Sequence, residues 1–123
     1  MASTLDGYIR YDGHKTEHLR EWLSAKATDL EWMAKLAEAS EDWIVITGDL
    51  RIHRNKAERQ AFRRLGLRGI ALAPAYQKTP MSRICAMLVD GWPRILTQVG
   101  ALSPPFLLEM PIKFGAKFRS LPL

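Results

Sequence analysis

Three acidic residues of the chain have the chemical type and the placement that metal-dependent chemistry needs. Asp49 closes the mostly apolar stretch WIVITGD, and Asp29 and Glu31 stand together ahead of it. Carboxylate oxygens are the ligands that hard cations such as Mg²⁺ and Mn²⁺ prefer in proteins. Asp49, Asp29 and Glu31 are therefore candidate metal ligands and candidate catalytic residues.

Each of these acids also has a structural explanation. Thr28 and Glu31 have the spacing of a capping box at the start of a helix. Asp29 would be favoured at the same helix start by the helix dipole. An acid such as Asp49, directly after a glycine, often forms a turn or caps the next helix. The residues alone leave both explanations open.

A strongly basic stretch follows Asp49 directly. Its basic residues are Arg51, Arg54, Lys56, Arg59, Arg63, Arg64 and Arg68, with Glu58 as the only acid among them. The whole chain carries a formal net charge of +5. Arginine binds the phosphates of nucleic acids well, so a polyanionic partner is indicated. We expect Arg51, Arg54, Arg59 and Arg63 to contact RNA, and the alternative is an ordinary solvated helix face.

Other chemistry-bearing residues give weaker signals. His14 and His18 are four residues apart but lack the cysteines or the HExxH context of a zinc site. Cys85 is the only cysteine and cannot form an internal disulfide, which favours a reducing cytoplasm. No apolar run approaches the ~20 residues of a membrane span. A cytoplasmic protein without membrane contact is therefore expected.

The elements that must position these residues alternate between helices and strands. Hydrophobic periodicity predicts helices over residues 16–26, 28–39, 55–65 and 79–89, the last kinked or restarted at Pro93 and continuing to about 102. It predicts strands at 43–46, covered on both faces, at 69–73, and at 106–114. This order indicates a small α/β domain with a mostly parallel sheet. Such sheets bind ligands at the carboxyl ends of their strands, where Asp49 lies.

Local signals set the expected ends of these elements. Asn55 and Glu58 should cap the helix 55–65, and Gly66 should end it. Thr79 and Pro80 form a cap and first-turn pair for the next helix. Pro111 cannot donate a backbone hydrogen bond, which favours an edge position for the last strand.

Taken in order, several motifs resemble those of the PIN-like nucleases related to VapC toxins. The matching segments are Asp29-Leu30-Glu31-Trp32, Trp43 to Asp49, Arg51 to Arg59 with the pattern R-x-x-x-N-x-x-E-R, GIALAP, Trp92-Pro93 and FLLEMPIKF. They lie within residues 13 to 121. The resemblance implies a three-layer α/β/α fold and cleavage of RNA by clustered acids, with Mg²⁺ or Mn²⁺ as cofactor. Asp49 matches the acid after the family's third strand, and Asp29 or Glu31 matches its middle acids.

The chain departs from this family at its start. Relatives begin with a strand that carries a further metal-binding aspartate, and this sequence has no such segment. We therefore expect a single, N-terminally truncated PIN-like domain over residues 1–123. Residues 1–12 would be irregular or form a substitute strand that brings Asp6 or Asp12. A partner chain, a homodimer or a start codon placed too far downstream would each resolve the departure.

The leading hypothesis is an endoribonuclease of the PIN-like, VapC toxin type, which an antitoxin protein would hold in check. The alternative is a catalytically degenerate PIN-like domain that binds nucleic acid or an antitoxin-like partner. A third hypothesis is a structural dimer subunit without affinity for nucleic acid. The first hypothesis predicts metal-dependent cleavage of RNA. The second predicts RNA binding that a chelator does not affect, and the third predicts no RNA binding.

Overall fold

The structure is a computed structural model that describes residues 29–39, 42–48, 54–113 and 115–123. In chain order its elements are α2 (Asp29–Glu38), β1 (Ile44–Thr47), α4 (Lys56–Arg64), β2 (Arg68–Leu72), the 3-10 helix η3 (Pro74–Lys78), α5 (Met81–Gly100), β3 (Phe106–Met110) and β4 (Arg119–Ser120). The helix expected over 16–26 and the substitute acids Asp6 and Asp12 lie outside the described residues.

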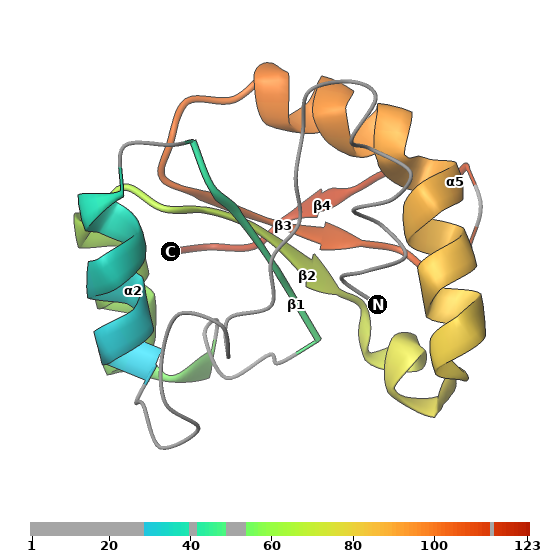
Figure 1. The fold of residues 1–123 in the computed structure, drawn as a ribbon, viewed down its shortest axis with the longest axis horizontal. Helices are drawn as coiled ribbons and strands as arrows, with labels where there is room; N and C mark the ends of the chain where they lie inside the picture. Colours follow the sequence, from blue (N-terminus) through green and yellow to red (C-terminus); the bar gives the residue numbers. More distant parts are fainter. Residues whose placement is uncertain (1–28, 40–41, 49–53, 114) are drawn as a thin grey trace.

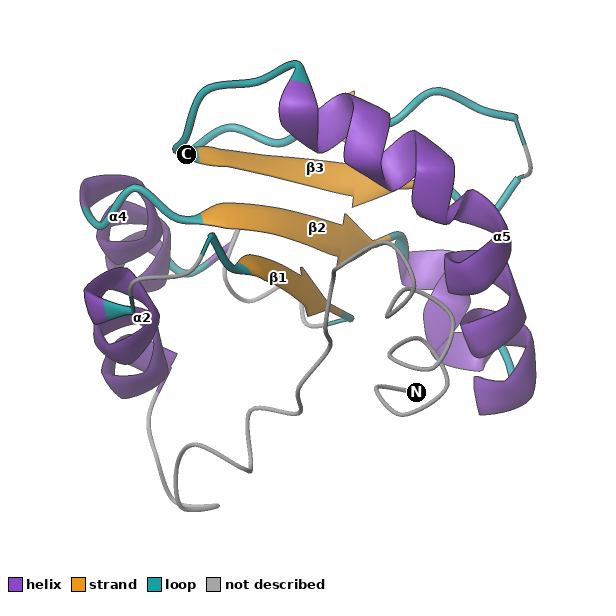
Figure 2. Ribbon diagram, turned by 45° about the horizontal axis from the view of Figure 1, so that its top comes forward, coloured by secondary structure: helices purple, strands orange, loops and turns teal. Residues whose placement is uncertain are grey.

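The strands form a four-stranded sheet in the order β1-β2-β3-β4. β1 pairs with β2 and β2 pairs with β3 in parallel, whereas the short β4 runs antiparallel to β3. Figures 1 and 2 show α2 and α4 together on one side of the sheet and α5 on the other. The predicted α/β fold, with three layers and a mostly parallel sheet, is confirmed.

Two separate apolar cores lie on the two faces of the sheet, because side chains alternate between faces along each strand. Phe106 and Leu108 of β3 pack with residues of α5 such as Leu88. Leu107, between them, belongs to the other core, which includes Phe62 of α4. Strands covered by helices on both faces need apolar residues on both sides, which explains the apolar run Phe106–Leu108 at the start of β3.

Helix α4 begins and ends at the residues that its local sequence predicts. The Oδ1 atom of Asn55 accepts a hydrogen bond from the backbone N–H of Glu58 at 3.1 Å, so the side chain of Asn55 caps the helix start. At the other end Gly66 adopts a φ of 68°, a left-handed conformation that glycine tolerates best. These two signals fix the position of the basic helix relative to β1 and β2.

Gly69 on β2 lets α4 approach the sheet closely. A Cβ atom built at this position would lie 2.8 Å from Cζ of Phe62 and 2.8 Å from Cδ1 of Leu107. Both neighbouring side chains are essentially fully buried and have little room to move. The absence of a side chain at Gly69 is therefore a packing requirement of the α4–sheet interface.

The predicted helix start at Thr79 and Pro80 is wrong. α5 begins at Met81, and Pro80 is its N-cap residue without a side-chain cap. The hydroxyl of Thr79 instead donates to the carbonyl oxygen of Ala75 at 3.1 Å. Thr79 is the C-cap residue of η3, a short helix that the sequence did not predict, and Pro80 occupies the N-cap position of α5.

Of the two later prolines, Pro93 agrees with one of its two predicted effects and Pro111 does not agree with its prediction. α5 continues through Pro93 without a restart, and Figure 1 shows its axis turning part-way along, as a proline kink would produce. β3 ends at Met110, one residue before Pro111, and pairs with both β2 and β4. The predicted edge position of this strand is wrong, because Pro111 follows the ladder and costs it no hydrogen bond.

β1 is less buried than expected. All four of its residues are half-buried, where coverage on both faces was predicted. Among the described strands β1 stands at one end of the sheet order, so only one of its edges has a described neighbour. Its parallel direction, however, agrees with the prediction. None of the described helices has the length and apolarity needed to cross a membrane.

Candidate functional site

The carboxyl ends of β1, β2 and β3 lie at one edge of the sheet because these strands are parallel. η3 follows β2 at this edge, and α4 begins there after β1. α2 precedes β1 by a short connection and runs back along it, so its first turn lies at the same end of the molecule (Figure 1). We call this end, formed by Thr47–Gly48, η3 and the first turns of α2 and α4, the carboxyl edge.

Asp49 and Arg51 lie outside the described residues, and their predicted roles stay predictions. The described chain reaches Gly48, one residue beyond β1, and resumes at Arg54. Gly48 is exposed at the carboxyl edge. Asp49 is bonded directly to this residue, so the backbone that leads into the strongest candidate acid is itself described.

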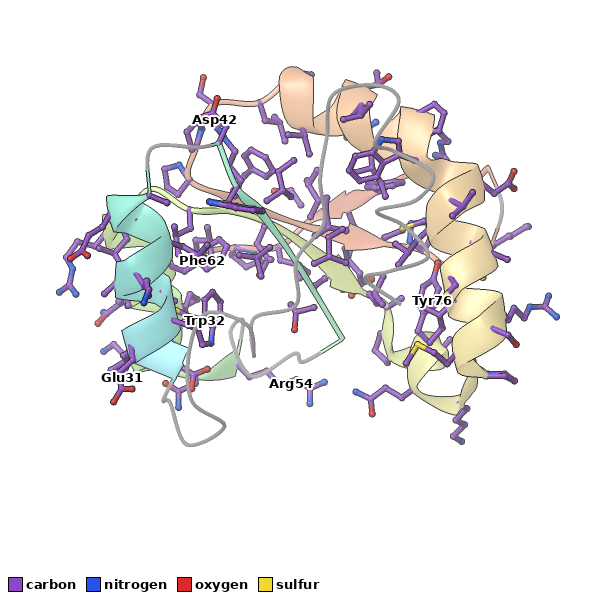
Figure 3. The ribbon with its side chains drawn as sticks, in the orientation of Figure 1. Glu31, Trp32, Asp42, Arg54, Phe62 and Tyr76 are labelled. Atoms are coloured by element: carbon purple, nitrogen blue, oxygen red, sulfur yellow. The ribbon has the colours of Figure 1, made fainter. Side chains whose placement is uncertain are left out.

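The other two candidate acids are both in the first turn of α2. Glu31 is exposed, and Figure 3 shows it on the outer side of α2 while Trp32 points toward the sheet. Asp29 is the first residue of α2. It precedes the buried Trp32 by three residues and the buried Met33 by four, and positions so spaced share one helix face.

The candidate RNA-binding residues that the structure describes follow the basic helix. Arg54 is exposed at the carboxyl edge in Figure 3, Arg63 is exposed, and Arg59 is half-exposed. The buried residues of α4 are Ala61 and Phe62. Arg59 and Arg63 are separated by about 6 Å along the helix axis, from a rise of about 1.5 Å per residue. The basic side of α4 therefore extends away from the carboxyl edge.

Arg68 has a different role from the other arginines of the basic stretch. Its Nη1 atom lies 3.4 Å from Oδ1 of Asp42, and both residues are near the amino ends of the strands. The Asp42 side chain is 91% exposed, and such a pair contributes only about 0–1 kcal/mol to stability. Arg68 thus neutralises a local acid at the opposite end of the sheet.

The turn that leads to Asp49 is held by a residue that the sequence analysis missed. Nε2 of Gln77, in η3, donates a hydrogen bond to the carbonyl oxygen of Gly48 at 3.2 Å. No spacing or composition signal connects two residues that are 29 positions apart in sequence. The contact arises because the neighbouring parallel strands β1 and β2 end side by side.

The side chain of Tyr76 anchors η3 to the rest of the fold. This side chain is 3% exposed, and its hydroxyl donates to the carbonyl oxygen of Pro111 at 2.8 Å. Burial raises the pKa of the Tyr76 phenol above its ordinary value of 10.0, because the charged form would lose solvation. The neutral, hydrogen-bonded phenol fixes η3, and η3 in turn presents Gln77 to Gly48.

The candidate acids suit a divalent cation in their chemistry. Asp29, Glu31 and Asp49 supply hard carboxylate oxygens, which Mg²⁺ and Mn²⁺ prefer. Within the described ranges, no three His, Cys, Asp or Glu side chains gather as a metal-binding group. Asp49 is not part of those ranges.

A comparison with models of protein families identifies the family of this chain. The family model described as "PIN like domain" matches residues 1–74, which is more than half of the 123 residues. The match runs from the first residue through α2, β1, α4 and β2. Neither the search of curated proteins nor the search of solved structures found a significant match. The family match and the three-layer fold together show that the chain belongs to the PIN-like domain family.

Proposed function

We propose that this protein is a metal-dependent endoribonuclease of the PIN-like type, with Mg²⁺ or Mn²⁺ as its cofactor. The observation that carries this proposal is the convergence of three features at the carboxyl edge. The strand end that leads into Asp49, the first turn of α2 with Asp29, and the start of the basic helix α4 all lie there (Figures 1 and 3). Family membership supports a nuclease role in general terms.

In this proposal Asp49 and Asp29 are the principal metal ligands and catalytic acids. Glu31 completes the set through water or by a change of side-chain direction, since it occupies the outer face of α2. A bound divalent cation would polarise a phosphoryl oxygen and lower the pKa of a coordinated water. The protein would hold the carboxylates close together as metal ligands. It would also bind the RNA backbone next to them.

The basic side of α4 would bind the RNA backbone. Arg54 stands at the carboxyl edge, and Arg59 and Arg63 continue along the helix. Guanidinium groups bind phosphates through paired hydrogen bonds, without reading the base sequence. Arg51 would join this set from the turn after Asp49. A single-stranded RNA lying along α4 would have one phosphodiester next to the acids. We place this reaction in the cytoplasm, with an antitoxin protein or a second copy of the chain as further candidate partners.

The experiment that tests this proposal compares the three carboxylates in one cleavage assay. Single-stranded RNA is incubated with Mn²⁺ and either the natural chain or one of the variants Asp49→Asn, Asp29→Asn and Glu31→Gln. We expect Asp49→Asn and Asp29→Asn to lower the rate by more than the ~10–100-fold that loss of a residue orienting a metal ligand costs, and Glu31→Gln to have a smaller effect. Full activity of Asp49→Asn would remove that residue from the mechanism.

A second candidate function is supported by the position of Glu31. Because Glu31 is on the outer side of α2, fewer carboxylates are available near the strand ends than the sequence indicates. A catalytically degenerate domain would then bind RNA, or an antitoxin-like protein, through the basic side of α4. RNA binding that is sensitive to salt but not to EDTA, together with absence of cleavage, would identify this function.

A further inference from the structure

We propose that a cavity at the amino ends of β1 and β2 binds one nucleobase of a single-stranded RNA. The cavity lies at the opposite end of the sheet from the carboxyl edge, and every residue that lines it is described. The proposal rests on the RNA-binding part of the proposed function, because the base would belong to the strand that α4 binds. It does not depend on the metal-binding carboxylates.

The cavity lies where the two helices on one side of the sheet end. Its walls come from the last turn of α2, from the residues just before β1, and from the connection between α4 and β2. Its volume is about 170 Å³. Pockets that enclose drug-sized ligands have volumes of about 300–1,000 Å³. This smaller cavity therefore suits a single ring system, with the sugar and the phosphate left outside.

The lining suits a nucleobase because it combines apolar walls with a polar pair. Leu36, Trp43 and Leu65 contribute apolar side chains, and Trp43 is half-buried. Bases commonly stack on aromatic side chains in proteins that bind single strands. The polar pair is Asp42 and Arg68, whose Oδ1 and Nη1 atoms are 3.4 Å apart. A carboxylate accepts hydrogen bonds from N–H groups on the edge of a base, and a guanidinium donates to its oxygen and nitrogen acceptors.

Basic residues of α4 stand next to this cavity in the chain. Arg63 and Arg64 are exposed and directly precede Leu65, which lines the cavity. Guanidinium groups bind phosphates without selecting the base. A strand whose phosphates are bound by these arginines would carry its bases past the end of α4, where the cavity opens. The arginines would thus supply the affinity for the backbone, and the cavity would add contacts to one base.

The alternative is that Asp42 and Arg68 form only a surface ion pair beside an unused hollow. The two possibilities predict opposite effects of Asp42→Ala. If no base enters, loss of a negative charge near a polyanion should strengthen RNA binding or leave it unchanged. If Asp42 accepts a hydrogen bond from a base, its loss should weaken RNA binding although the net charge becomes more positive.

The test measures, by calorimetry, the binding of a pool of short single-stranded RNAs and of inorganic polyphosphate, which has no bases. Ala37→Leu places a larger side chain at the cavity. Ala34→Leu is the matched control, because Ala34 is exposed on the same helix but does not line the cavity. We expect Ala37→Leu to weaken RNA binding by about 10-fold, the size expected for loss of a stacked base. Its salt dependence should not change, because no phosphate contact is lost.

Polyphosphate binding should be the same in both alanine variants and in the natural chain. Asp42→Ala should weaken RNA binding, whereas Asp90→Ala, the same charge change on α5, should not. Thermal unfolding of each variant checks that the fold is intact.

Three results would overturn the base site. They are unchanged RNA affinity in Ala37→Leu, an equal loss of affinity for RNA and polyphosphate, and tighter RNA binding by Asp42→Ala. RNA binding along α4 would still stand if Arg59→Glu with Arg63→Glu weakened it. A natural chain that does not bind RNA would overturn both the base site and the proposed function.

Discussion

At the scale of single residues, Tyr76 links the end of β3 to the candidate site. Its hydroxyl bonds to the Pro111 carbonyl oxygen, and burial raises the pKa of its phenol above 10.0. A raised folded-state pKa means that the neutral phenol is preferred more strongly in the folded chain than in the unfolded one. The resulting stability is fully present below the unfolded value and is lost as pH rises through the folded one.

Replacement of Tyr76 by phenylalanine tests this assignment. At neutral pH we expect Tyr76→Phe to lower the free energy of unfolding by about 1 kcal/mol, because the Pro111 carbonyl loses its donor. Above pH 10.0 the natural chain should lose stability that the variant does not, so the difference between them should shrink. Urea unfolding of both proteins across this range measures the difference. A difference that stays constant would show that the phenol is not the titrating group.

Prediction of single site residues from the sequence was uneven. Glu31 was predicted as a metal ligand from its type and place, yet it lies on the outer side of α2, which only the helix register reveals. Gln77 gave no signal because its partner Gly48 is 29 positions away. Asp49 remains a prediction from its place after an apolar strand, since it lies outside the described residues.

At the scale of elements, the sequence correctly predicted the helix ends that depend only on neighbouring residues. The Asn55 cap and the Gly66 stop were both predicted, because each depends on a few consecutive residues. Thr79 failed as a helix cap because α5 begins later than predicted, so that Thr79 ends η3 and Pro80 occupies the N-cap position of α5. Pro111 failed as an edge marker because strand order is a long-range property.

The interface between α4 and the sheet provides a stability test. Gly69→Ala should lower the free energy of unfolding by about 1–3 kcal/mol, the usual cost of overpacking. The added methyl group would meet Phe62 and Leu107, each 2.8 Å from its position.

The matched control for this substitution is Gly100→Ala in the last turn of α5. A Cβ atom at Gly100 would meet nothing within 4 Å, so this variant should be neutral or slightly more stable. Chemical denaturation of both variants provides the comparison. Equal stability of Gly69→Ala and the natural chain would show that α4 packs less tightly than the distances indicate.

At the scale of the whole molecule, the three layers bring remote segments to one edge. The carboxyl edge combines the first turn of α2, the end of β1, the start of α4 and η3, which are separated in the chain by the rest of the helices and strands. The sequence predicted this convergence in outline, because parallel strands place their carboxyl ends together. It could not predict which side of α2 would face the sheet edge, or the support that η3 provides.

The basic side of α4 should dominate binding to RNA. The double variant Arg59→Glu with Arg63→Glu should weaken binding and lower the salt dependence by about 1.4 in log–log slope, from two lost phosphate contacts. Arg83→Glu with Lys117→Glu changes the net charge equally at exposed positions outside α4. Fluorescence anisotropy at several salt concentrations distinguishes the two. Equal effects of both double variants would mean that net charge, not α4, binds the RNA.

The most direct test of the proposed function is cleavage of a mixed single-stranded RNA pool by the purified chain. The reaction is run with Mn²⁺, with EDTA added, and with Asp49→Asn in place of the natural chain. We predict cleavage with Mn²⁺ that EDTA stops and that Asp49→Asn lacks, while RNA binding by the variant is kept. Cleavage that continues in EDTA or in Asp49→Asn, or no cleavage by a folded chain that binds RNA, would contradict a metal-dependent nuclease built on this carboxylate.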